Sequence, residues 1–99
     1  MSAQFDLYVA PDRGLIVVLQ NDQIEMLNTR VFAPCLPVGT GGIDFPRLTP
    51  GFYHAERHYR VMTHLLGVTR LRQLGTRVGS IAHLRDEITR AMDLLMTGF

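Results

Sequence analysis

The spacing of apolar side chains changes near residue 81, and this change limits the folds that the chain can adopt. Before it, short apolar or alternating runs lie between turn residues, which is typical of β-strands. After it, apolar residues recur at the spacing of an α-helix with polar residues between them, at Ile81, Leu84, Ile88, Ala91, Met92 and Leu95. The sequence therefore predicts a mostly-β domain, a small antiparallel barrel or rolled sheet closed by a C-terminal helix.

Short strands are predicted along most of the chain before the helix. Residues 4–9 alternate, so Phe5, Leu7 and Val9 are expected on one face of a strand and the residues between them on the other. The run at 15–20, with β-branched residues at 16–18, predicts a strand that is buried on both faces and pairs back across the turn at 11–14. The other predicted features are strands at 30–36, 53–55, 58–63 and within 66–74, a polar connection at 21–29, loops at 37–51, a hairpin turn at Glu56 and Arg57, and a helix cap at Ser80.

Composition narrows the class of protein further. The 99 residues predict one domain, 1–99, and 46% of them are apolar, which fits a folded chain with a hydrophobic core. So much apolar material in a small domain predicts a homodimer, because a twofold partner would cover the excess. The net charge of +1 is far below that of typical nucleic-acid-binding domains. The single cysteine, Cys35, and the lack of a signal-peptide pattern or membrane-spanning run predict a cytoplasmic protein with no membrane contact.

The residues that carry chemistry do not combine into a predicted catalytic, metal or cofactor site. The histidines lack a carboxylate or cysteine that would complete a ligand set; they are His54, His58, His64 and His83. Cys35 is expected to be a small buried apolar residue. The glycine-rich run at 39–42 lacks the Lys-Ser/Thr pair and the following helix of a phosphate-binding loop. Five arginines could grip phosphates, although a solvated face is the commoner role of such a set; they are Arg57, Arg60, Arg70, Arg72 and Arg77.

The sequence also resembles the CcdB family, the toxin half of a bacterial toxin–antitoxin pair that poisons DNA gyrase. The resemblance covers most of the chain outside 37–51 and rests on four stretches in a common order. These are QFDLY at 4–8, VVLQNDQIEMLNTRVFAP at 17–34 with its Arg30 and Pro34, YRVMT at 59–63, and HLRDEITRAMDLLMTGF at 83–99.

This resemblance implies an SH3-like barrel with a small additional antiparallel sheet, a C-terminal helix and a twofold homodimer. It implies that the toxin enters the dimer of DNA gyrase A, traps gyrase on cleaved DNA and catalyses nothing itself. It further implies a cognate antitoxin, whose binding segment orders on the toxin, and contact with operator DNA only through the antitoxin complex.

The family's gyrase-binding positions fall on ten residues of this sequence. They are Phe5, Asn21, Gln23, Ile24, Glu25, Asp86, Asp93, Thr97, Gly98 and Phe99. Where the best-known family pattern has Trp-Gly-Ile at the tail, this sequence has Thr97, Gly98 and Phe99, so the aromatic ring is two positions later. An apolar end that packs into a partner is the expected role of this tail, and a tail folded back on its own barrel is the alternative.

Two other classes remain open. An endoribonuclease toxin shares this barrel, and His58, His83 and the arginines are the only candidates for its acid, base and basic groove. A degenerate toxin would keep only dimerisation and antitoxin binding.

Overall fold

The computed structural model of the chain describes residues 3–39 and 45–98. Seven strands, four short 3-10 helices and one α-helix occur in these ranges. The strands are β1 (Asp6–Ala10), β2 (Gly14–Val18), β3 (Thr29–Pro37), β4 (Gly51–His54), β5 (Arg57–Val61), β6 (Gly67–Arg70) and β7 (Thr76–Ser80). The helices are η1 (Asp22–Ile24), η2 (Thr63–Leu65), η3 (Leu71–Gln73), η4 (Ala82–Leu84) and α1 (Arg85–Thr97).

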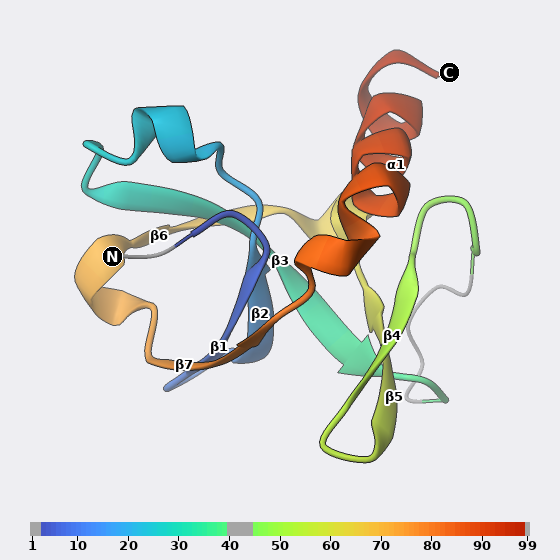
Figure 1. Cartoon of the computed structure of the whole chain (residues 1–99), viewed down its shortest axis with the longest axis horizontal. Helices are drawn as coiled ribbons and strands as arrows, with labels where there is room; N and C mark the ends of the chain where they lie inside the picture. Colours follow the sequence, from blue (N-terminus) through green and yellow to red (C-terminus); the bar gives the residue numbers. More distant parts are fainter. Residues whose placement is uncertain (1–2, 40–44, 99) are drawn as a thin grey trace.

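All of the described strand pairs are antiparallel, and β3 is the strand on which the architecture depends. One edge of β3 pairs with β2, while its other edge pairs first with β6 and then with β5. The strands β7, β1, β2, β3 and β6 curl into a half-barrel, and β4 and β5 continue from the end of β3 as a separate wing (Figure 1). The predicted SH3-like barrel with a small additional antiparallel sheet and a C-terminal helix is confirmed.

The curled sheet buries side chains on both of its faces. One apolar cluster lies under α1 and contains Leu7, Val17 and Ala33, whereas a second contains Tyr8, Ile16 and Phe32. The register places Leu7 opposite Val17 and Tyr8 opposite Ile16, so successive residues of each strand enter different clusters. The prediction that 15–20 is buried on both faces is confirmed for Ile16, Val17 and Val18, which are at most 1% exposed.

The first strand differs from its predicted alternation. Tyr8 and Asp6 are buried, whereas Val9, which was expected beside Leu7 in the core, is 46% exposed. The reason is the curl of the barrel. It covers the face of β1 that carries Asp6 and Tyr8, and it leaves Val9 uncovered at the end of the opposite face. Asp6 tolerates burial because its carboxylate forms an ion pair with the Arg77 guanidinium of β7 at 3.0 Å and accepts a hydrogen bond from it at 3.2 Å.

The strand β7 has no signal in the sequence. Its five residues contain a single apolar side chain, Val78, and four of the five are exposed. This strand forms because its backbone pairs with β1. The approach to it is tight, since a Cβ at Gly75, where φ is +94°, would lie 2.1 Å from the carbonyl oxygen of Val9. Only glycine fits at this position.

The C-terminal helix lies across the cluster under it and begins later than predicted. Residues 82–84 form η4 and α1 starts at Arg85; the predicted cap Ser80 lies one residue before the N-cap Ile81, and its Oγ accepts a hydrogen bond from the Ala82 N–H at 3.2 Å. Ile88 and Ala91 are buried, and burying an isoleucine side chain stabilises a fold by about 1.5–3 kcal/mol. The expected inward position of Leu95 is wrong, because the helix runs past the edge of the barrel and leaves this residue 36% exposed.

Candidate functional site

The connection between β2 and β3 is a folded, exposed surface loop. Asn21 Oδ1 accepts a hydrogen bond of 2.8 Å from the Gln23 backbone N–H and so caps η1. Ile24 is 45% exposed, and Gln23 and Glu25 are also exposed. Four of the ten predicted contact residues, Asn21, Gln23, Ile24 and Glu25, therefore lie together on one short surface segment, which we call the 21–25 loop.

A buried arginine fixes the far side of this loop. Arg30 of β3 is 2% exposed, and its guanidinium donates hydrogen bonds to the carbonyls of Leu27 at 2.6 Å, Thr29 at 2.9 Å and Glu25 at 2.9 Å. Its planar fork suits several acceptors at fixed angles. The family-like spacing of Arg30 and Pro34 thus has a structural purpose in this chain, because Arg30 sets the shape of the loop.

Gln20 and Gln4 connect the same loop to the barrel and to α1 through hydrogen bonds. Gln20 donates to the Ile24 carbonyl at 3.1 Å and accepts from the Val31 N–H at 3.2 Å. The backbone N–H of Gln4 donates to Asp22 Oδ1 at 2.7 Å, while the side-chain Oε1 of Gln4 accepts from the Arg85 guanidinium at 3.3 Å. The loop and the start of α1 are therefore joined through Gln4.

Phe5, a fifth predicted contact residue, does not lie on this surface. It precedes β1 with a φ of 70°, is 2% exposed and packs in the cluster under α1. The Arg85 guanidinium lies 5.0 Å from the centre of its ring. Its ring belongs to the core that supports Gln4 and α1, and a direct partner contact by Phe5 stays a prediction.

The remaining predicted residues lie along α1. Asp86, Asp93 and Thr97 are exposed, and the Thr97 hydroxyl donates to the Asp93 carbonyl at 2.7 Å. Gly98 ends the helix in the left-handed conformation, with a φ of 81° and its N–H bonded to the Leu94 carbonyl at 3.0 Å. Phe99 lies outside the described residues.

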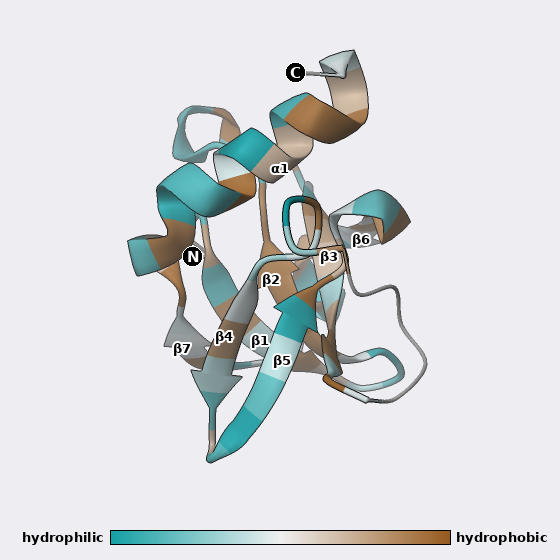
Figure 2. Ribbon diagram, turned by 90° about the vertical axis from the view of Figure 1, so that its right-hand side faces the viewer, coloured by the Kyte–Doolittle hydropathy of each residue, from teal (hydrophilic) through white to brown (hydrophobic). Residues whose placement is uncertain are grey.

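Exposed apolar side chains accompany both candidate segments. Met26 and Leu27 follow the 21–25 loop and are 72% and 48% exposed, while Met96 near the end of α1 is 71% exposed. Figure 2 shows the apolar colouring of the last turns of α1, and in Figure 1 these turns and η1 both project towards the top of the molecule. Exposed apolar side chains that adjoin one another, such as Met26 and Leu27, are typical of surfaces that partners cover.

Three residues with potential catalytic chemistry, Cys35, Tyr8 and His58, have defined surroundings in the structure. Burial raises the pKa of the Cys35 thiol well above its usual value, which suppresses the nucleophilic thiolate. Burial, and next the Asp6 carboxylate, raise the pKa of the Tyr8 phenol. His58 stacks on Tyr53, with ring centres 4.5 Å apart. Within residues 3–39 and 45–98, no three histidine, cysteine or carboxylate side chains are grouped to hold a metal ion.

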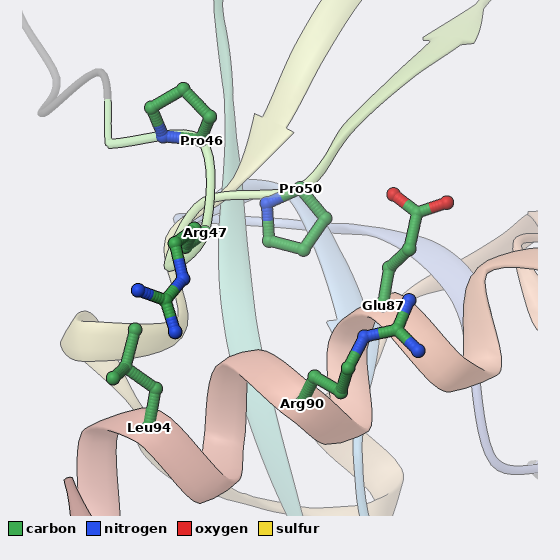
Figure 3. A pocket seen from close by; sticks show the side chains of 6 residues that line it. All are labelled: Pro46, Arg47, Pro50, Glu87, Arg90 and Leu94. Atoms are coloured by element: carbon green, nitrogen blue, oxygen red, sulfur yellow. The ribbon is translucent and has the colours of Figure 1, made fainter. Parts of the chain in front are cut away.

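Two surface depressions have basic rims. One of about 600 Å³ follows the 21–25 loop and is lined by Asn28, Thr29, Arg70, Leu71 and Arg72. The other, of about 240 Å³, lies between α1 and the segment 46–50 and is lined by Pro46, Arg47, Pro50, Glu87, Arg90 and Leu94 (Figure 3). Arg70 and Arg72, two of the five arginines that the sequence suggested as phosphate-binding residues, line the depression beside the 21–25 loop.

Sequence reasoning missed the residues that shape these surfaces. One signal in the sequence could have indicated Arg30 and Gln20. Each is a polar residue within a predicted strand, and a polar side chain that is buried there needs hydrogen-bond partners. The depression at Arg47 and Arg90 carried no signal, because its walls come from segments far apart in the chain.

The fold of this chain is one that occurs among toxins. The structure aligns with one described as the crystal structure of an Mtb toxin, with a TM-score of 0.73 and 12% identity over 92% of this chain and 99% of that one. It also aligns with an endoribonuclease in complex with its cognate antitoxin from a mycobacterial species, with a TM-score of 0.77 and 10% identity over 97% of this chain and 95% of the other. At these identities the likeness concerns the fold.

Residues 4–98 match the CcdB protein family, so the chain belongs to that family. The family and the fold together support a toxin of a toxin–antitoxin system. A comparison with curated proteins gave no match. No helix within residues 3–39 and 45–98 has the length and apolar character needed to cross a membrane.

Proposed function

We propose that this protein binds DNA gyrase A and traps the complex of gyrase with cleaved DNA. The binding surface consists of the 21–25 loop, the exposed face of α1 at Asp86 and Asp93, and the tail from Thr97. It works by occupying and holding gyrase, without chemistry of its own.

The single observation that carries this proposal is the rigid presentation of an apolar residue in the family's contact segment. Ile24 is half-exposed, yet hydrogen bonds from Gln20 and Arg30 fix the loop around it. A loop whose backbone is ordered before binding loses little conformational entropy when a partner covers it. Such a residue is suited to be an anchor of an interface.

The same proposal includes two protein partners. A second copy of the chain would form a twofold homodimer, and a cognate antitoxin would neutralise the toxin through a segment that orders on binding. The cytoplasm is the compartment in which gyrase and antitoxin would both be met.

The test is to incubate the purified chain with gyrase, ATP and supercoiled plasmid. We expect linear DNA to accumulate after denaturation of the gyrase, and only when gyrase is present. Ile24→Arg is the matched inactive variant. Failure of the parental chain to generate gyrase-dependent breaks at micromolar concentration would overturn the proposal.

The second candidate is an endoribonuclease on the same barrel. It is favoured by the likeness to the mycobacterial endoribonuclease and by the depression beside Arg70 and Arg72, which could take an RNA backbone. Incubation of the chain with single-stranded RNA in place of plasmid separates the two candidates. RNA fragments that disappear in Arg70→Gln would favour the nuclease. A chain that gives neither kind of break and still binds its antitoxin would be a degenerate toxin.

A further inference from the structure

The depression between α1 and the segment 46–50 is lined by both apolar and cationic side chains. Pro46, Pro50 and Leu94 supply its apolar lining. Figure 3 shows Arg47 and Arg90 on opposite sides of Pro50, with their guanidinium groups pointing in different directions. We call this depression the Arg47–Arg90 groove.

One wall of the groove is held rigidly by the core. Thr49 is fully buried, and its hydroxyl both accepts from the Phe45 N–H at 3.1 Å and donates to the Phe45 carbonyl at 2.9 Å. The Thr63 hydroxyl donates to the Leu48 carbonyl, and Arg60 donates to the Thr49 carbonyl at 3.0 Å. The turn that carries Arg47 is therefore fixed from several directions, and the groove exists before any ligand binds.

The two arginines of the groove have unused hydrogen-bonding capacity. Both are exposed, and neither has a hydrogen bond, ion pair or ring contact with the part of the chain that the structure describes. Glu87 lies on the Arg90 side of the groove (Figure 3), so that side is partly neutralised and the Arg47 side is the more positive. With two arginines and one glutamate, the lining carries a net charge of +1.

We infer that this groove binds an acidic peptide segment in which two carboxylates flank an apolar side chain. The apolar side chain would lie on Pro50 and Leu94, and the carboxylates would accept hydrogen bonds from Arg47 and Arg90. Guanidinium groups pair with carboxylates through two parallel hydrogen bonds, which favours such a ligand over a neutral one. Within the toxin–antitoxin pair, and resting on that proposed function, the antitoxin is the partner that supplies this segment.

The test uses a fluorescein-labelled peptide, Gly-Ser-Glu-Leu-Leu-Glu-Gly-Ser, and a second peptide with Gln in place of both Glu. Fluorescence anisotropy at low ionic strength gives the Kd of each peptide. We expect the Gln peptide to bind at least about fivefold more weakly, because exposed ion pairs contribute up to about 1 kcal/mol each.

Variants that remove a positive or a negative charge from the groove should change Kd in opposite directions, and this makes the test specific. Arg47→Gln should weaken binding of the acidic peptide about two- to fivefold, while Glu87→Gln should tighten it by a similar factor. The matched controls are Arg72→Gln and Glu56→Gln, which make the same charge changes elsewhere on the surface and should leave Kd unchanged. Equal effects of the controls, equal binding of the Gln peptide, or no binding at millimolar concentration would overturn the inference.

A cellular experiment connects the groove to the antitoxin. The charge-reversed variant Arg47→Glu, which leaves α1 unchanged, should still arrest growth but require more co-expressed antitoxin for rescue than the parental chain does. Rescue at the same antitoxin level would show that the antitoxin does not use the groove. A parental chain that does not arrest growth would instead contradict the proposed gyrase poisoning, and the peptide titrations would still decide what the groove binds.

Discussion

Replacing Arg30 with methionine removes the hydrogen bonds that shape the 21–25 loop while keeping an apolar stem in the barrel. Three carbonyls lose their donor, those of Glu25, Leu27 and Thr29. A hydrogen bond to a charged group contributes about 1.5–3 kcal/mol when its partner stays buried, which would give an upper limit near 9 kcal/mol.

Two features of the structure lower this limit. Glu25, Leu27 and Thr29 are exposed, so their carbonyls can recover water, and the net value of a hydrogen bond then falls to about 0.5–1.5 kcal/mol. Removal of Arg30 also ends the cost of burying its charge. We therefore expect the free energy of unfolding to fall by about 2–3 kcal/mol. This value lies in the lower half of the range obtained when the net value is applied to all three hydrogen bonds. This corresponds to a fall in Tm of about 10–20 °C in a domain of this size.

Urea unfolding and amide hydrogen exchange together measure this effect. The N–H groups of Ile24, Glu25 and Leu27 form the internal hydrogen bonds of the loop and should exchange faster in the variant, whereas those of β2 should change only with global stability. Arg72→Met is the control, since Arg72 is exposed and its loss should change stability by no more than about 0.5 kcal/mol. Unchanged exchange at the three loop amides, or equal stability of the two variants, would contradict the assigned role of Arg30.

Three further predictions follow from the burial and the charges of the described residues. Ile24→Arg should stay folded, because Ile24 is 45% exposed, yet lose growth arrest; a fall in Tm as large as that of Arg30→Met would argue against the surface role. A chain that ends at Thr97 should lose no more than about 0.5 kcal/mol of stability and should lose killing, measured by thermal unfolding and growth arrest together; a folded and still lethal truncation would count against a binding tail. The raised pKa of Tyr8 stabilises the fold below the phenol's ordinary pKa of 10.0, and this contribution is lost as pH rises through the higher folded pKa. Urea unfolding between pH 9 and 11 should therefore show a steeper loss of stability in the parental chain than in Tyr8→Phe, and parallel curves would exclude the effect.

The kinds of element and their order follow from the sequence alone. The change of apolar period near residue 81 predicted a sheet followed by a helix, and the run at 15–20, with β-branched residues at 16–18, predicted a strand without a solvent face. Gly98 ends α1 with a φ of 81°, a conformation that a glycine adopts without steric cost and that its place after the helical pattern favours. These features depend on neighbours along the chain, so the local pattern of residues contains the information needed to predict them.

Which side chains are buried, and which remote segments meet, depends instead on the folded arrangement. Apolar alternation indicates one buried face per strand, but the curl of the barrel covers the second face of β1 and exposes Val9. The strand β7 exists only because β1 supplies its backbone partner, and Phe5 enters the core only because α1 covers it. Arg30 becomes buried because the loop that precedes it folds back over its guanidinium. Arg47 and Arg90 line the same groove because Thr49 anchors the segment 46–50 against the core and α1 passes beside that segment. Each of these outcomes depends on the curvature and register of elements far apart in the sequence, and residue spacing along one segment contains no information about either.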